Sequence, residues 1–197
     1  MYTEARFDPT NQLSGSAPPL DEALPPAPRS LAPTLNPDPT LPTGLLLTEE
    51  DLDPEFAIVD LNIRAVATLQ TTESRSPLPV PPSVSAFARG AIEDAGKRLS
   101  IALGLPIFKT SDSAAIVDWA HKMGIQQIMT PYIPVGPTRD ATAALRANLS
   151  AAGIAYVPRL RNWDRHAWPH ATRGFFQLRK QIPELLSETR TRSVNPA

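Results

Sequence analysis

Residues 159–180 concentrate the side chains of this chain that are best suited to chemistry. The segment holds two of the three tryptophans, two of the three histidines and two of the six phenylalanines, with six lysines or arginines and one acid, Asp164. Such side chains could ligate a metal ion, supply a catalytic histidine, or form a surface that binds nucleic acid or another protein domain. Each possibility makes its own demands on residue spacing.

Metal binding and hydrolysis fit that spacing poorly. Asp164, His166 and His170 offer a carboxylate and two imidazoles, which zinc or iron would accept as ligands. Spacings of two and four residues do not place all three on one helical face, and Pro169 interrupts the run. A hydrolytic His166 would need a nucleophile, and the chain has no GxSxG-like turn to supply one. The sequence therefore predicts neither a metal centre nor a catalytic residue.

Two interpretations of this segment remain open. Arginines interleaved with aromatic rings suit nucleic acid, because guanidinium groups neutralise phosphates and rings stack on bases. Alternatively, Trp168, Phe175 and Phe176 are buried anchors that pack a terminal helix against the domain, while the arginines face outward and contact another domain or its DNA. The candidate residues for nucleic-acid binding or domain docking are Arg161, Trp163, Arg165, Trp168, His170, Arg173, Phe175 and Phe176.

A second candidate site combines an acidic turn at 48–53 with a proline-rich loop at 131–137. The acids of the turn could bind a cation with substrate oxygens, or could form a solvated acidic loop. In the second loop Tyr132 could stack on a ring and Arg139 could pair with an anion, although a rigid structural loop is an equal alternative. No glycine-rich phosphate-binding motif follows residues 45–48. The candidate cofactor-binding residues are Thr48, Glu49, Asp51, Tyr132, Gly136 and Arg139.

These loops must be positioned by alternating strands and helices. Apolar runs predict five strands, at 44–48, 65–69, 106–109, 125–130 and 154–157. Helical periodicity predicts three helices between them, at 83–103, 111–123 and 140–152. Such alternation indicates an α/β fold with a five-stranded doubly wound, Rossmann-like parallel sheet spanning about 43–160. Ligands of such sheets bind at the carboxyl ends of the strands, where the strand order reverses.

The first predicted helix has the clearest sequence markers. Ser83 or Ser85 can cap its amino end, and Gly104 follows its last turn. Its apolar residues recur at spacings of three and four, which predicts one continuous stripe packed against the sheet: Val84, Phe87, Ala88, Ala91, Ile92, Ala95, Leu99 and Ala102.

Composition sets the domain plan. Residues 1–42 include ten prolines, which predicts an extended or disordered proline-rich arm before a domain at 43–187 and a flexible tail at 188–197. The net charge is −1, but residues 159–180 sum to +5, so we expect any anion-binding role in the carboxyl-terminal third. There is no cysteine, no apolar run of membrane-spanning length and no signal peptide at the amino end, which together predict a cytoplasmic protein without a membrane partner.

Several segments resemble the α/β domain of the photolyase and cryptochrome family. They are LLLTEEDL at 45–52, FARGAIEDAGKRL at 87–99, IMTPYIPVGPTRD at 128–140 and, most strongly, NWDRHAWPHATRGFFQLRKQIPELL at 162–186. Residues 2–13, YTEARFDPTNQL, look like the end of a photolyase-like FAD-binding domain. The resemblance implies a flavoprotein in which a helical flavin domain precedes the α/β domain.

The resemblance also implies partners and cofactors. FAD belongs to the helical domain, so this chain is expected to act as a scaffold or chromophore-binding unit of a DNA-repair or blue-light-sensing flavoprotein and not to catalyse repair alone. A folate or deazaflavin antenna is possible, although Thr48-Glu49-Glu50-Asp51 replaces the arginine-rich turn of most photolyases. The expected partner is a helical FAD-binding domain or chain, with DNA reached through it. The alternatives are a stand-alone nucleotide-binding module and a DNA-binding accessory protein.

Overall fold

The computed structural model describes residue 31 and residues 35–194, so most of the arm predicted at 1–42 lies outside the described residues. The side chains of Arg173 and of residues 188–194 also lie outside the description. Within this range, none of the helices combines the length and the apolar character that crossing a membrane requires.

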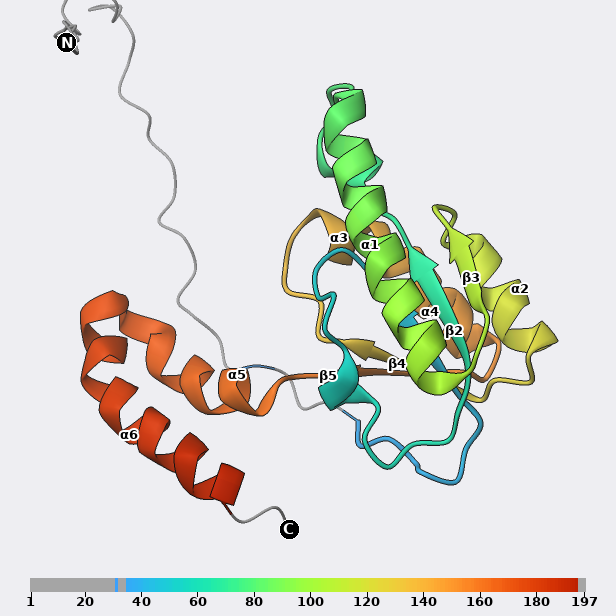
Figure 1. Ribbon diagram of the computed structural model, residues 1–197. Coiled ribbons are helices and arrows are strands. Elements are labelled where there is room, and N and C mark those ends of the chain that lie inside the picture. The colour runs from blue at the N-terminus through green and yellow to red at the C-terminus, as the bar shows by residue number, and fades with distance from the viewer. Residues whose placement is uncertain (1–30, 32–34, 195–197) are drawn as a thin grey trace, which may run out of the picture.

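The predicted α/β fold with a five-stranded parallel sheet is confirmed (Figure 1). Every neighbouring pair of strands is parallel, and the order is β3-β2-β1-β4-β5, so the strand order reverses between β1 and β4. The strands are β1 (Thr43–Leu47), β2 (Ile63–Leu69), β3 (Ile107–Thr110), β4 (Gln127–Pro131) and β5 (Ala155–Arg159).

Helices and short 3-10 turns cover both faces of the sheet. On one face, Leu45 and Leu47 of β1 pack with Leu99 of α1. On the other, Leu46 packs with side chains of α2 and α4, including the fully buried Leu149. The connecting elements are η2 (Glu55–Ala57), η3 (Thr72–Arg75), α1 (Pro82–Leu103), α2 (Ala114–Lys122), α3 (Pro137–Ala141) and α4 (Ala143–Ala151).

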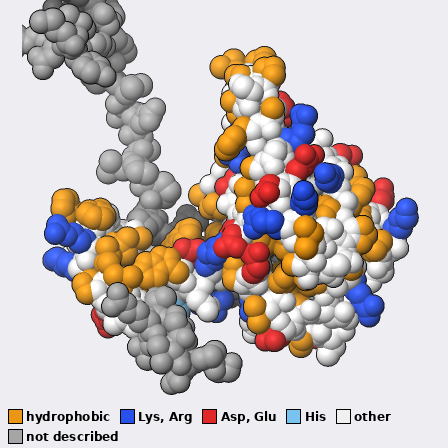
Figure 2. Space-filling model, viewed as in Figure 1, with side chains coloured by type: hydrophobic (Ala, Val, Ile, Leu, Met, Phe, Trp, Pro, Cys, Tyr) orange, Lys and Arg blue, Asp and Glu red, His pale blue; other side chains and the backbone are white. Residues whose placement is uncertain are grey.

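The amino-terminal half of α1 departs from both predictions made for it. No serine caps the helix: it begins at Pro82, and the Ser85 hydroxyl donates instead to the Glu73 carboxylate. The predicted stripe also fails there, because Val84 is exposed and Phe87 is 79% exposed. A helix of 22 residues is about 33 Å long, whereas the longest strand has seven residues and spans about 23 Å. The helix therefore extends beyond the sheet, and its tip carries apolar side chains (Figure 2).

The third predicted helix, at 140–152, begins earlier and is interrupted. α3 starts at Pro137, directly after Gly136 at a φ of 146°, and α4 starts after Thr142. The Thr142 hydroxyl donates to the Thr138 carbonyl at 2.9 Å and lies 3.1 Å from the Arg139 carbonyl. Because a threonine hydroxyl can compete with the backbone for these carbonyls, the helix divides at this residue.

The chain leaves β5 into a helical hairpin made of α5 (Asn162–Ala167), η4 (Trp168–Arg173) and α6 (Phe175–Val194). Gly174, at a φ of 81°, makes the turn before α6. Figure 1 shows the hairpin extending to one side of the sheet, where it covers neither face. α6 continues to Val194, into the region 188–197 for which a tail was predicted.

Candidate functional site

The loops at the carboxyl ends of β1 and β2 are joined through the Glu49 carboxylate. Its Oε1 accepts hydrogen bonds from the Thr71 and Thr72 backbone N–H groups at 2.7 and 2.8 Å and from the Thr72 hydroxyl at 2.6 Å. Its Oε2 accepts one from the Thr71 hydroxyl at 3.1 Å. All four donors come from the start of η3, so this predicted cofactor-binding carboxylate is occupied by the protein's own backbone and hydroxyl groups.

A second set of contacts crosses the point where the strand order reverses. The Thr138 hydroxyl, on α3 after β4, donates to Glu50 Oε1 at 2.7 Å and lies 3.0 Å from the Thr71 hydroxyl. Arg75 forms an ion pair with the same Glu50 oxygen at 3.1 Å. Thr48 is buried, and its hydroxyl accepts from the Glu50 N–H at 3.4 Å. The acidic turn is therefore tied to η3 and α3, and the reversal point is bridged by side chains of the protein.

Asp51 turns away from this network and binds Arg161 at the start of the hairpin. The guanidinium meets the carboxylate with two hydrogen bonds, from Nε at 3.0 Å and from the terminal nitrogen at 2.6 Å. It also donates to the Asp53 carbonyl at 2.7 Å and lies 4.3 Å from the centre of the Phe56 ring. Hydrogen bonding to Asp51 raises the pKa of Arg161 above its ordinary value. Arg161, predicted as a docking residue, joins the hairpin to the β1 loop through these contacts.

Tyr132, predicted to stack on a ligand, makes its ring contact within the protein. Its ring meets that of Trp168 edge to face, with centroids 5.9 Å apart, and its backbone N–H donates to the Arg159 carbonyl at 2.9 Å. The β4 loop therefore supports the base of the hairpin. Asp51 and Tyr132 are thus both directed at the hairpin, while Glu49 is directed at η3.

Arg139 lies elsewhere, among the groups that influence Tyr156 of β5. Burial raises the pKa of the Tyr156 hydroxyl to about 12, and the charges of Arg146 and Arg139 together with a hydrogen bond to Thr130 only partly oppose that effect. The Arg139 side chain therefore acts on a half-buried phenol, and among the described residues no hydrogen bond joins it to the other predicted cofactor-binding side chains.

This burial predicts a loss of stability at high pH. Because the pKa of Tyr156 is about 12 in the folded protein and near 10 in an unfolded chain, folding disfavours the phenolate. Stability should be fully present below pH 10 and should fall as the pH rises from about 10 to about 12. Urea unfolding across this range should show that fall in the wild type and a smaller one in Tyr156→Phe. Parallel losses in the two proteins would mean that Tyr156 is not the group responsible.

The aromatic residues of the hairpin are exposed, which corrects the prediction that they are buried anchors. Phe175 is 62% exposed and Phe176 is 74% exposed, with their rings 5.7 Å apart in an edge-to-face pair. Trp163 and Trp168 are 40% and 38% exposed. Arg165 and His170 also lie at the surface, whereas the Arg173 side chain lies outside the described residues. Figure 2 shows the hydrophobic side chains gathered over this hairpin.

The histidines of the hairpin lie beside a small cavity. His166 and His170 line a space of about 140 Å³ together with Glu184 of α6. His166 Nδ1 lies 2.6 Å from the Asn162 carbonyl within its own helix, so one ring nitrogen already has a partner. Across the described part of the chain, no three histidine or acidic side chains converge as a metal site would require.

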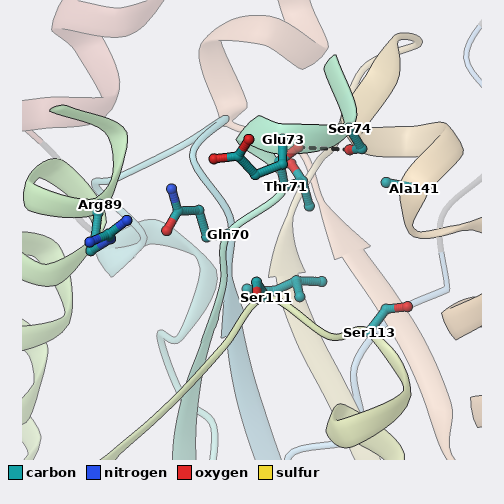
Figure 3. A pocket seen from close by; sticks show the side chains of 9 residues that line it. Gln70, Thr71, Glu73, Ser74, Arg89, Ser111, Ser113 and Ala141 are labelled. Atoms are coloured by element: carbon teal, nitrogen blue, oxygen red, sulfur yellow. Dashed lines mark hydrogen bonds between the residues drawn. The ribbon is translucent and has the colours of Figure 1, made fainter. Parts of the chain in front are cut away.

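Sequence reasoning did not identify a polar cavity at the carboxyl ends of β2 and β3. The cavity has a volume of about 310 Å³ and lies between η3, α1, the β3–α2 loop and α3 (Figure 3). Arg89 and Gln70 lie next to each other on one side. Glu73 and Ser74 lie on another side, and Ser111 and Ser113 lie below them in the view. In the sequence, only the position of Ser111 and Ser113 after a predicted strand could have indicated this cavity, because isolated serines form no motif.

The predicted cofactor-binding residues are therefore divided among different tasks. Thr48, Glu49 and Gly136 belong to the network at the reversal point or to its border, Asp51 and Tyr132 support the hairpin, and Arg139 lies near Tyr156. No family model, no curated protein and no solved structure matches this chain.

Proposed function

We propose that this chain is a scaffold and docking domain that binds a helical FAD-binding domain or chain of the photolyase type. The observation that carries the proposal is the aromatic face of the hairpin, which we define as Trp163, Trp168, Phe175, Phe176 and Leu186; all five are exposed. Figure 2 shows hydrophobic side chains gathered over the hairpin, and large exposed apolar patches mark sites of association. Tryptophan and phenylalanine also rank among the residues enriched in protein interfaces.

The position of the aromatic face favours a helical partner. The hairpin leaves the sheet, and no element of the described chain covers the exposed rings. Two helices that expose an apolar stripe bury it most readily against the helices of a partner, because side-chain ridges on one helix fit into grooves on another. The helical flavin domain that the sequence resemblance implies has this architecture. It would cover the aromatic face while the α/β sheet supports the hairpin from behind through Asp51 and Arg161.

FAD would be held by the partner and not by this chain. An antenna chromophore of the folate or deazaflavin type has less support, because the residues predicted to hold one do not fit it. The Glu49 carboxylate accepts hydrogen bonds from Thr71 and Thr72, and the Asp51 carboxylate accepts them from Arg161. The Tyr132 ring lies against Trp168. A chromophore there would have to displace these contacts.

Gel filtration with the purified full chain tests the proposal. The chain is mixed with a photolyase-type FAD-binding domain encoded in the same genome, and complex formation is followed by flavin absorbance in the earlier-eluting peak. The double variant Phe175→Asp and Phe176→Asp should weaken binding at least about tenfold, since it places charges in a desolvated contact. Val135→Asp is the matched control, because Val135 is 82% exposed but lies outside the aromatic face.

Other outcomes would overturn the proposal. If the flavin domain does not bind the wild-type chain, or if Val135→Asp weakens binding as much as the double variant, the aromatic face is not the docking site. Duplex DNA that binds the chain in a salt-dependent way, with loss on Arg165→Ala and no flavoprotein complex, would instead favour the DNA-binding accessory.

A further inference from the structure

We infer that the polar cavity at the carboxyl ends of β2 and β3 binds a small phosphorylated sugar. The cavity, of about 310 Å³, lies at the lower end of the size range typical of small-molecule sites, and it lies at the carboxyl edge of the sheet, to one side of the point between β1 and β4 where the strand order reverses. It is separate from the aromatic face of the hairpin. The inference therefore stands independently of the docking proposal.

The cavity offers hydrogen-bond donors that have no partners among the described residues. Arg89 comes from α1, and Ser111 and Ser113 come from the β3–α2 loop. None of these three side chains has a hydrogen bond or an ion pair with any described residue. A guanidinium fork and two hydroxyls match the several acceptor oxygens of a phosphate group. The amino end of α2 contributes little to phosphate binding, because the Ala114 N–H already donates to Asp112 Oδ1 at 2.9 Å.

The lining also offers acceptors. Glu73 accepts from the Ser85 hydroxyl with one carboxylate oxygen, and the other oxygen has no partner among the described residues. Gln70 donates its amide N–H to the Ser85 carbonyl at 3.3 Å, which leaves its amide oxygen available. A carboxylate and an amide oxygen suit the hydroxyl groups of a sugar. Because Glu73 would repel a bare anion, the cavity favours a molecule with an anionic end and a hydroxyl-bearing end.

The remaining polar groups of the lining are already used by the protein. The Thr71 hydroxyl belongs to the network with Glu49 and Thr138, and the Ser74 hydroxyl donates to the Thr71 carbonyl at 2.7 Å. They hold η3 in place and keep the shape of the cavity. The lining therefore offers both unused donors and unused acceptors, which match the phosphate oxygens and the hydroxyl groups of a phosphorylated sugar.

Calorimetric titration of the full chain with ribose 5-phosphate, ribose and inorganic phosphate tests the inference. Ribose 5-phosphate should bind more tightly than either of the other two. Arg89→Gln should weaken its binding at least about tenfold, because the charge-assisted hydrogen bonds to phosphate are lost. Lys97→Gln is the matched control: it removes one positive charge from the same helix at an exposed residue outside the cavity.

Glu73→Gln separates the two ends of the ligand. It should strengthen the binding of inorganic phosphate, since a repelling charge is removed, and should narrow the preference for ribose 5-phosphate over phosphate. Circular dichroism spectra that match the wild type establish that each variant is folded. Absence of ribose 5-phosphate binding to the wild type, or equal weakening by Lys97→Gln and Arg89→Gln, would overturn the inference.

Discussion

Glu49→Ala is expected to lower the free energy of unfolding by about 3 kcal/mol. The substitution removes the acceptor of four hydrogen bonds, two from backbone N–H groups and two from hydroxyls of Thr71 and Thr72, and both threonines are buried. A buried donor that loses its partner costs about 1–3 kcal/mol, and water entering the site would recover part of that. Urea unfolding followed by circular dichroism measures the change.

Two further variants show whether the carboxylate acts through these bonds. Glu49→Gln keeps an amide oxygen where Oε1 accepts three of the four bonds, so its cost should be about 1 kcal/mol. Glu50→Ala removes an exposed carboxylate that contacts Thr138 and Arg75, and should cost about 1 kcal/mol or less. If all three variants unfold alike, Glu49 is not a structural acceptor, and a role in ligand binding would again be open.

The sheet was predictable because its signals are local. Each strand is a short apolar run, and Gly104, Gly124 and Gly153, all with positive φ, end or follow the helices between strands. A run such as residues 44–48 is buried on both faces, as is typical of a central parallel strand. The errors at this level are shifts at the ends of elements, such as Pro81 at the N-cap of α1 in place of a serine.

The contacts of the acidic turn at 48–53 were not predictable from the sequence, because they depend on partners far away along the chain. Asp51 binds Arg161, 110 residues later, and Glu49 binds Thr71 and Thr72, 22 and 23 residues later. The sequence indicates that such carboxylates need either solvent or a partner, but it does not indicate which donors the fold brings to them. The run of acids was therefore compatible with a solvated loop or a cation site, and it did not indicate the internal contacts that the structure shows.

In the hairpin, aromatic residues that were expected to be buried are exposed, and Arg161, which was expected to face outward, has internal partners. Aromatic residues at helical spacing are usually buried, but burial requires an uncovered surface. α1 and η2 already cover one face of the sheet and α2 and α4 cover the other, so Phe175 and Phe176 have no internal surface to pack against. Arg161 found internal acceptors because it lies directly after β5, beside the β1 loop. Residue type alone could not reveal that the sheet was already covered.

Gly44→Ala is expected to lower the free energy of unfolding by about 2 kcal/mol, the second-largest effect we expect. Gly44 lies in β1, the central strand, and a Cβ atom there would be 2.8 Å from Cη2 of Trp119 and 3.2 Å from Cγ2 of Ile125. The indole has little room to withdraw, since it is buried and stacks on Phe108 with ring centroids 6.2 Å apart. Thermal unfolding should therefore show a midpoint lowered by roughly 4–8 °C.

Gly90→Ala is the matched control, because it adds the same methyl group where no atom lies within 4 Å of the new Cβ. Gly90 lies on the exposed side of α1, so alanine should raise the free energy of unfolding by about 0.5–1 kcal/mol through its higher helix propensity. The two substitutions thus separate close packing from backbone entropy, since only the first meets a neighbour. A loss at Gly44 no greater than the change at Gly90 would mean that Trp119 moves aside at little cost and that β1 and α2 are packed less tightly than their contacts indicate.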